Sequence, residues 1–238
     1  MNRNGWLSIP DPYAAMVFAQ AGFDSVTLDM QHGLFDQAAI IRTLMALPGA
    51  TPRRLVRVPA NEPAMIGKVL DAGADGVIAP LINSAADARA LAASCWYPQR
   101  GQRSFGPSVA ALRAGATPYT QAAARIEVYA MIETREGLEA VDAIAGIDGI
   151  TGLYVGPNDL ALSLGFGAGS DRAEPELHAA FRRITGAAQR AGKTAGLFCA
   201  SAAYAKQAVA FGFDMLTIAS DTAALAAGAA AALAQFGL

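Results

Sequence analysis

Eight short apolar stretches recur along this chain, and each is followed by a segment with the features of a helix. The stretches begin near residues 5, 25, 54, 76, 126, 150, 194 and 214. Near-continuous apolar runs of strand length are typical of parallel strands that are buried on both faces. Such strands, alternating with helices over 238 residues, predict a single (β/α)8 barrel that spans residues 1–238.

An open, doubly wound sheet is the main alternative to a barrel. Its usual nucleotide-binding motifs are absent, because no Gly-x-Gly-x-x-Gly follows the first stretch and no Gly-Lys-Ser/Thr loop occurs. We see no linker, low-complexity tract or block of like charges that would divide the chain. One α/β domain is therefore the expectation.

Several expected helices have recognisable first residues. Asp11 precedes a proline and can cap a helix over residues 13–21. Asn61 can cap a helix that has Pro63 in its first turn. Ser220 and Asp221 form a good capping pair for the closing helix.

Residues 95–118 break the alternation. Their first half, from Cys95 to Pro107, is rich in glycine, proline and arginine and also contains aromatic residues. A long loop inside a compact domain is usually functional or disordered, and the aromatic and arginine content favours an ordered loop.

Composition excludes several classes of protein. The formal net charge of -2 gives no electrostatic footprint for nucleic acid or an anionic membrane. No apolar run reaches transmembrane length, and residues 1–5 do not read as a signal peptide. The two cysteines, Cys95 and Cys199, have no paired spacing, so we expect reduced thiols and a cytoplasmic protein.

Two consecutive apolar stretches end in an acid. The stretch from Ile126 ends at Glu133, and the stretch from Ile150 ends at Asp159. Carboxylates at neighbouring strand ends would enter the same space, where they suit a hard divalent cation. The structural alternative is that Glu133 caps the following helix, since glutamate is favoured in a first turn, and that Asp159 caps a short turn over residues 160–164.

The second and third stretches also end in polar residues. In (β/α)8 barrels the active site lies at the carboxyl ends of the strands. His32 follows the second stretch, where it could be a hydrogen-bonded structural residue, a metal ligand or an acid–base group. A metal site made of carboxylates favours the acid–base role. Asp29 could orient His32 or hold a metal-bound water.

Arg57 ends the third stretch. It could form a structural ion pair with Asp29 or Glu133, or it could stabilise a developing enolate oxygen or a carboxylate. Asp71 lies near the end of the following helix, where it could simply be a polar residue at a helix end with no functional role.

Seven segments together give the chain a resemblance to a known family. They are Ala21-Gly22-Phe23-Asp24, Leu28-Asp29-Met30-Gln31-His32-Gly33, Val56-Arg57-Val58-Pro59, Leu70-Asp71-Ala72-Gly73-Ala74, residues 97–106, Ile132-Glu133-Thr134-Arg135-Glu136 and Val155-Gly156-Pro157-Asn158-Asp159-Leu160-Ala161. In these segments the chain resembles the HpcH/HpaI aldolases, the metal-dependent (class II) pyruvate aldolases that include 4-hydroxy-2-oxoheptanedioate and 2-keto-3-deoxy sugar acid aldolases. The resemblance covers nearly the whole chain.

The resemblance implies roles for single residues. Glu133 and Asp159 match the direct ligands of a divalent metal, usually Mg²⁺, Mn²⁺ or Co²⁺. Arg57 matches the arginine that steadies the pyruvate oxygen. His32 matches the catalytic histidine, and Asp71 matches the aspartate paired with it.

The resemblance also implies a substrate contact and an assembly. Asp29 matches an outer residue near metal-bound water, and the backbone of Gly156, Pro157, Asn158 and Asp159 matches the segment that holds the pyruvate carboxylate. The implied fold is a phosphoenolpyruvate/pyruvate-type barrel whose last helix is exchanged with a neighbouring subunit in a hexamer. Residues 221–236 have almost no polar face, which independently favours a buried helix and a homo-oligomer.

Three residues, at two places in the chain, depart from the better-known members of that family. Met30-Gln31-His32 stands where they have Gly-Glu-His, and Met131 stands where several have glutamine. These changes leave the metal ligands in place and bear on the aldehyde that the enzyme accepts.

The expected reaction is the reversible cleavage of a 4-hydroxy-2-keto acid to pyruvate, or a close 2-keto acid such as hydroxypyruvate, and an aldehyde. A Schiff-base mechanism is disfavoured, because Lys68 and Lys206 fall in predicted helices and Lys193 precedes a strand. The alternatives are a malyl- or citramalyl-coenzyme A lyase-like enzyme and a non-catalytic protein that binds metal or sugar acids.

Overall fold

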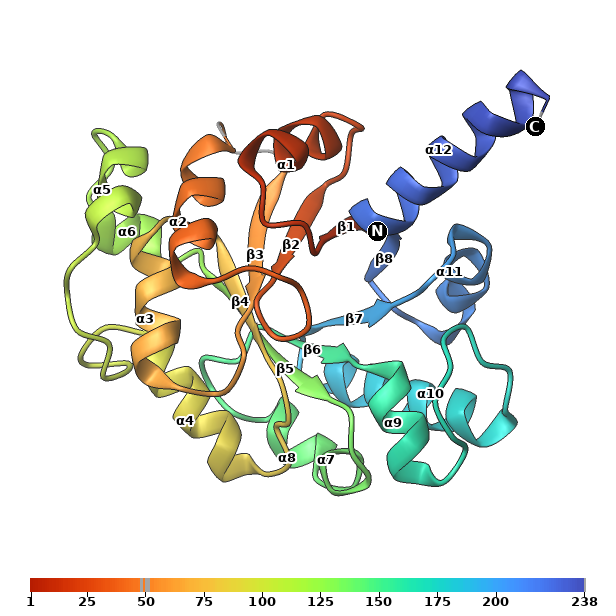
Figure 1. Cartoon of the computed structure of the whole chain (residues 1–238). Helices are drawn as coiled ribbons and strands as arrows, with labels where there is room; N and C mark the ends of the chain where they lie inside the picture. The colour runs from red at the N-terminus through yellow and green to blue at the C-terminus, as the bar shows by residue number, and fades with distance from the viewer. Residues whose placement is uncertain (48, 50–51, 238) are drawn as a thin grey trace.

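Eight parallel strands close into a barrel in the order β1-β2-β3-β4-β5-β6-β7-β8 (Figure 1). The computed structural model describes residues 1–47, 49 and 52–237. The strands are β1 (Asn2–Leu7), β2 (Ser25–Asp29), β3 (Arg53–Arg57), β4 (Gly76–Ala79), β5 (Glu127–Ile132), β6 (Gly152–Val155), β7 (Thr194–Phe198) and β8 (Met215–Ser220). Each begins within three residues of its predicted start, so the predicted (β/α)8 barrel is confirmed.

Helices alternate with the strands and surround the barrel (Figure 1). They are α1 (Pro12–Ala19), α2 (Gln37–Ala46), α3 (Pro63–Asp71), α4 (Ala85–Cys95), α5 (Ser108–Ala114), α6 (Tyr119–Ala123), α7 (Arg135–Glu139), α8 (Val141–Ala145), α9 (Pro157–Leu164), α10 (Pro175–Arg190), α11 (Ala202–Ala208), the 3-10 turn η1 (Val209–Phe211) and α12 (Asp221–Phe236).

The predicted helix caps are confirmed at two of three places. The Asp11 side chain accepts a hydrogen bond from the N–H of Ala14, and the Ser220 side chain caps α12. The prediction for Asn61 is wrong. Glu62 occupies the cap position without a side-chain hydrogen bond, and the Asn61 amide donates to the Asp87 carbonyl at 3.1 Å instead.

The segment that breaks the alternation is only partly a loop. Residues 96–107 are irregular, and α5 and α6 then cross between β4 and β5. The loop is ordered as expected, because its backbone is bonded to α4 and to the residue that follows this helix: the N–H of Gln102 donates to the Ala93 carbonyl and that of Arg103 to the Trp96 carbonyl. The Arg100 guanidinium also lies over the Trp96 ring, 3.7 Å from its centre.

The barrel interior is filled by large side chains. Trp6, Leu55, Ile78, Tyr129, Met131, Tyr154 and Met215 form this inner cluster. The Tyr129 ring needs a glycine on the neighbouring strand, since a Cβ atom on Gly152 would lie 2.4 Å from it. A second, larger apolar layer separates the barrel from the helices.

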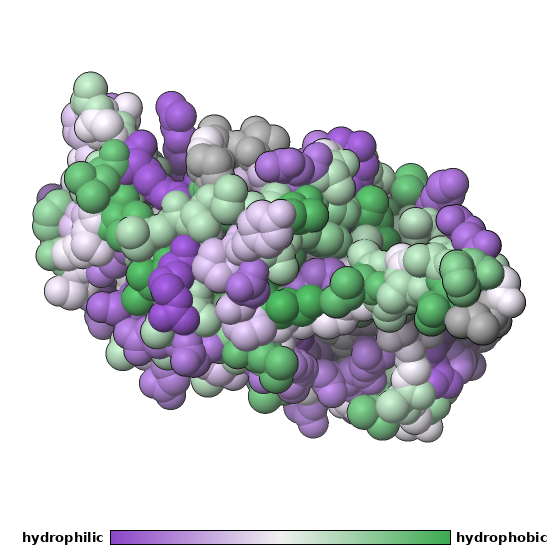
Figure 2. Space-filling view, turned by 45° about the horizontal axis from the view of Figure 1, so that its top comes forward, coloured by the Kyte–Doolittle hydropathy of each residue, from purple (hydrophilic) through white to green (hydrophobic). Residues whose placement is uncertain are grey.

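Helix α12 projects from the barrel (Figure 1). From Thr222 to its end it is exposed, and its large apolar side chains Leu225, Leu233 and Phe236 are 66%, 58% and 82% exposed. In Figure 2 it forms the green and pale-green projection at the right. Such an apolar surface is normally covered. Within the described residues, no helix has the length and apolar character needed to cross a membrane.

The start of α12 is nevertheless fixed to the barrel. The Asp221 carboxylate is 6% exposed and accepts hydrogen bonds from the N–H groups of Ser8 and Ile9 at about 3 Å. Asp221 therefore joins the end of β8 to the end of β1.

Candidate active site

A cavity of about 290 Å³ opens at the carboxyl ends of the strands. It is lined by Trp6, Ser8, Asp29, His32, Arg57, Met131, Glu133, Tyr154, Gly156, Pro157, Asn158, Asp159, Phe198, Ser220 and Thr222. The barrel thus brings together all the predicted site residues except Asp71. Its lining contains no lysine, consistent with the argument against a Schiff base.

Glu133 is the most unusual group in this cavity. It directly follows β5 and is only 2% exposed. Its Oε1 atom accepts a hydrogen bond from the N–H of Leu81 at 2.8 Å, whereas Oε2 is buried and has no partner among the described residues. The alternative role as a helix cap is not seen, since Thr134 caps α7. A buried carboxylate oxygen without a partner is costly unless something binds it.

The backbone around Glu133 is shaped to hold it. Leu81 has φ 54°, a left-handed conformation that is rare for a residue with a side chain, and its N–H reaches Glu133. On the other side, a Cβ atom on Gly156 would lie 2.5 Å from Glu133 Oε2. The segments that follow β4 and β6 therefore both approach this one carboxylate closely.

Asp159 lies beside Glu133 in the first turn of α9. It is exposed, and Gly156 rather than Asp159 occupies the cap position. Burial raises the pKa of Glu133 above its ordinary value, and the negative charge of Asp159 raises it further, against the opposing hydrogen bond from Leu81. The two acids are close enough to repel each other, which favours a cation between them.

Asp29 and Arg57 form a two-point ion pair on the opposite wall. Arg57 Nε donates to Asp29 Oδ1 at 2.8 Å and Arg57 Nη2 donates to Oδ2 at 2.6 Å. Burial acts to raise the pKa of Asp29, but the hydrogen bonds and charge of Arg57 outweigh it, so the pKa is lowered. One of the expected structural pairings of Arg57 is thus present, and its guanidinium still lines the cavity.

Trp6 supports this ion pair from below. Its Nε1–H donates to Asp29 Oδ2 at 3.2 Å, and the Arg57 guanidinium lies 4.9 Å from the centre of its ring. Trp6 was not among the predicted site residues. It lies within the first apolar stretch, where the sequence pattern does not distinguish it from core residues.

His32 stands at the rim of the cavity. It is exposed, and its backbone N–H donates to Asp29 Oδ1 at 3.3 Å. Gln31 donates to the same oxygen at 3.0 Å. Asp29 therefore positions the loop that carries His32, while the imidazole makes no hydrogen bond to another described residue.

Asp71 is not brought to His32 within one chain. It ends α3, away from the carboxyl ends of the strands, and its carboxylate is paired with Arg103 at 2.5 Å. Arg103 is itself buried, and its Nε and Nη1 atoms have no partner among the described residues.

Several other lining residues were not selected from the sequence. Ser8, Tyr154, Phe198, Ser220 and Thr222 belong to this group. Ser8 and Thr222 add hydroxyl groups where β1 and β8 end, and Phe198 packs edge-on against Trp6 with ring centres 5.2 Å apart. Apolar patterns report burial, and they do not say which inward residues reach the open end of a barrel.

The two acids fit a hard divalent cation. No group of three or more His, Cys, Asp and Glu side chains is arranged for a metal in the described part of the chain. Glu133 and Asp159 would therefore supply two oxygen ligands and leave further positions for substrate and water. The fit rests on Glu133 Oε2, the buried carboxylate oxygen that has no partner among the described residues.

Fold and site together define a (β/α)8-barrel enzyme with an acid pair and an arginine in one small cavity. The family model described as HpcH/HpaI aldolase/citrate lyase matches residues 5–228. The chain belongs to this family.

Similar proteins fall mainly on the aldolase side of the family. A hydroxypyruvate/pyruvate aldolase of Rhizorhabdus wittichii is 43% identical over 227 residues, covering 94% of this chain and 90% of that protein. A pyruvate aldolase of Rhizobium etli is 33% identical, covering 97% and 91%. A 5-keto-4-deoxy-D-glucarate aldolase of Klebsiella pneumoniae is also 33% identical, covering 91% and 84%.

Solved structures agree on the fold. A HpcH/HpaI aldolase/citrate lyase family protein from Burkholderia cenocepacia superposes with a TM-score of 0.89 at 32% identity, covering 99% of this chain and 94% of the other.

The burial of Glu133 predicts a pH effect on stability without metal. Its pKa is raised in the folded protein, so the folded state keeps the proton to a higher pH than the unfolded chain. The stabilisation that the bound proton gives the folded state is complete below pH 4.5, the ordinary pKa of a glutamate. This stabilisation is lost as the pH rises through the pKa of Glu133 in the folded protein. Glu133→Gln should gain stability relative to the wild type over that interval. Urea unfolding in chelator, from about pH 4 to about pH 8, measures this difference, with the exposed Glu136→Gln as control. A difference that stays flat with pH would contradict it.

Proposed function

We propose that the protein is a metal-dependent pyruvate aldolase. It reversibly cleaves a 4-hydroxy-2-keto acid to pyruvate, or to a close 2-keto acid such as hydroxypyruvate, and an aldehyde. The observation that carries the proposal is the buried, unpartnered Oε2 atom of Glu133 in the cavity that also holds Asp159, Arg57 and His32. The names of the similar aldolases support it.

Glu133 and Asp159 hold the cation in this proposal, with Mg²⁺, Mn²⁺ and Co²⁺ as the candidates. When bound, the cation acts as a Lewis acid on the 2-keto acid end of the substrate and lowers the energy of the enolate. The two residues differ in rigidity: Glu133 is fixed by Leu81, whereas Asp159 is exposed and free to adjust.

Arg57 stabilises the enolate oxygen. Its guanidinium is 11% exposed and its direction is set by Asp29 and by the Trp6 ring. Such a preorganised donor does not have to reorient as negative charge develops, and removing one typically costs about a hundred- to a thousandfold in rate.

The first turn of α9 holds the substrate carboxylate. Gly156 caps this helix and Pro157 has no N–H, so the N–H groups of Asn158 and Asp159 are the first-turn donors. A helix N-terminus favours an anion at this position.

His32 moves the proton at the aldehyde end. In cleavage it accepts the proton of the C4 hydroxyl as the C3–C4 bond breaks, the carbonyl of the aldehyde forms, and the bonding electrons pass into the enolate. Protonation of the enolate carbon then gives the methyl group of pyruvate. Asp29 positions His32 through the backbone of its loop.

Asp71 can pair with His32 only if it comes from a second chain, because its own chain places it at the end of α3 with Arg103. This fits the proposed homo-oligomer, a hexamer that exchanges α12. The protein then works in the cytoplasm on small molecules, without nucleic acid or membrane.

A panel of 4-hydroxy-2-keto acids, assayed for pyruvate release with and without chelator, tests the reaction. We expect release that requires a divalent cation. Malyl- and citramalyl-coenzyme A, assayed for the acetyl-coenzyme A that both would release, test the lyase alternative, which would be favoured if only they were cleaved. A protein that merely binds metal or sugar acids would cleave none of these substrates.

Glu133→Ala and Asp159→Ala should each abolish metal binding and activity, because each removes one of two oxygen ligands. Calorimetric titration with Mn²⁺ measures the affinity, and circular dichroism checks that the barrel is folded. Glu136→Ala, an exposed acid on α7, is the matched control. Unchanged affinity in both site variants would refute the ligand assignment.

His32→Ala should keep its metal affinity and lose aldol turnover by roughly a hundred- to ten-thousandfold, the usual contribution of a general acid or base. Exchange of the pyruvate methyl protons, followed by NMR, separates enolate formation from carbon–carbon bond cleavage. Loss of the metal in this variant would assign His32 to the ligands instead.

Light scattering should find an oligomer of the 24.5 kDa chain at micromolar concentration. A chain that ends after Thr222 keeps the Asp221 anchor but lacks the apolar part of α12, so it should stay folded and dissociate. Leu225→Glu with Leu233→Glu provides a full-length comparison. A monomeric wild-type protein would be the opposite result.

A further inference from the structure

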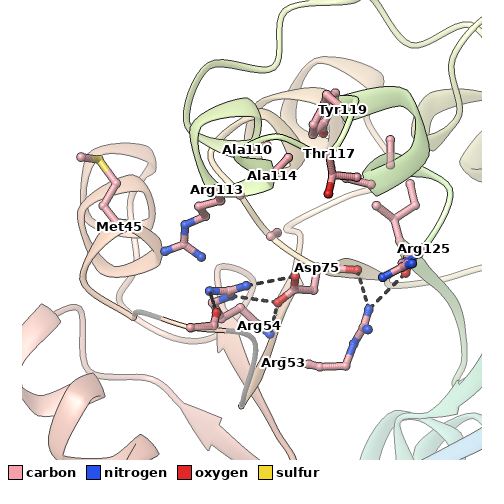
Figure 3. Close-up of a pocket in the computed structure, with 16 residues that line it drawn as sticks. Met45, Arg53, Arg54, Asp75, Ala110, Arg113, Ala114, Thr117, Tyr119 and Arg125 are labelled. Carbon is pink, nitrogen blue, oxygen red and sulfur yellow. Dashed lines mark hydrogen bonds and ion pairs between the residues drawn. The ribbon is translucent and has the colours of Figure 1, made fainter.

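A second and larger cavity, of about 790 Å³, lies at the other end of the barrel from the candidate active site (Figure 3). It forms where β3 and β5 begin, under α5 and α6. Its lining includes Met45, Arg53, Arg54, Asp75, Arg113, Ala114, Ala122, Arg125 and Ile126. None of them lines the first cavity.

Four arginines line this cavity, and two of them are neutralised by acids. Arg54 is paired with Asp75 through Nε at 2.8 Å and Nη2 at 3.0 Å. Arg53 Nε lies 2.6 Å from Glu127 Oε1. These contacts account for both carboxylates, so the cavity keeps an excess of positive charge in a chain whose net charge is -2.

Arg113 is one source of that excess. Its Nη2 atom donates to the Leu44 and Leu47 carbonyls at the end of α2, whereas Nη1 is buried and has no partner in the described part of the chain. Burial, and then the nearby charge of Arg54, lowers the pKa of Arg113. A bound anion would give this donor a partner and offset its charge.

Arg125 is the other source. It is exposed, and its side chain forms no hydrogen bond or ion pair with any residue that the structure describes. In Figure 3, Arg113 and Arg125 lie on either side of Asp75, which is itself held by Arg54. The cavity lining also includes the short or apolar side chains of Met45, Ala114, Ala122 and Ile126, which provide room for carbon atoms.

We propose that this cavity is a binding site for a small organic anion, a phosphate or a carboxylate on an apolar body, with Arg113 and Arg125 supplying the charge. Arg54 and Arg53 shape the floor and remain paired with their acids. The site is independent of the aldolase proposal, because it shares no residue with the first cavity.

Calorimetric titration of the full chain tests this site. Phenyl phosphate and benzoate separate the phosphate from the carboxylate, and inorganic phosphate tests the need for an apolar body. We expect phenyl phosphate or benzoate to bind more tightly than inorganic phosphate. Arg125→Gln should weaken this binding roughly ten- to hundredfold, as expected for a lost charged hydrogen bond, without affecting folding because the side chain is unpaired.

Two variants complete the test. Arg89→Gln makes the same charge change on the exposed surface of α4 and should bind like the wild type. Arg57→Ala, in the first cavity, should also retain binding, which excludes the candidate active site as the location. The proposal is overturned if no probe binds at millimolar concentration, if Arg125→Gln binds as tightly as the wild type, or if Arg57→Ala abolishes binding.

Discussion

The pairing of β1 with β8 closes the barrel, and this closure brings residues from the first and the last strand into the same cavity as those that follow β5 and β6. The register shifts between Asn4 and Gly5 along this pairing, so the ends of the two strands are not related by a simple ladder. Asn4 is fully buried at this seam and bonds to Thr27 of β2 at 2.7 Å. Two residues further along β1, the Trp6 side chain contacts both Asp29 and Arg57. The polar contacts near the β1–β8 pairing are therefore close to those of the candidate active site along the same strand.

The two buried acids of the site, Asp29 and Glu133, differ in how their negative charge is compensated. Asp29 is surrounded by donors from Arg57, Trp6 and the His32 loop, so its negative charge is satisfied within the chain. Glu133 is equally buried, but only its Oε1 atom accepts a hydrogen bond, and its Oε2 atom has no partner among the residues that the structure describes. A proton or a cation must complete it. The unequal treatment of two buried acids is a physical reason to assign them different roles.

The sequence predicted the barrel and the strand ends because apolar stretches and their exits depend on local patterns. His32, Arg57, Glu133 and Asp159 could be chosen in this way, since Arg57 ends a strand and the other three follow one. Trp6 could not be separated from core residues, because its apolar stretch looks the same whether a side chain is enclosed or reaches the open end. The left-handed backbone of Leu81 depends on contacts between strands, and no local pattern encodes them. Asp71 shows the limit of a resemblance, since the matching motif pairs it with His32 whereas within this chain its carboxylate pairs with Arg103.

Gly156 also limits which substitutions this part of the cavity wall can accept. Because Glu133 occupies the space of its missing side chain, this part of the cavity wall cannot be varied without displacing the acid. Ser8, which follows β1, and Thr222, in the first turn of α12, also present hydroxyl groups to the cavity. Their side chains can change without entering the space that Glu133 occupies, whereas a side chain at position 156 would displace this acid.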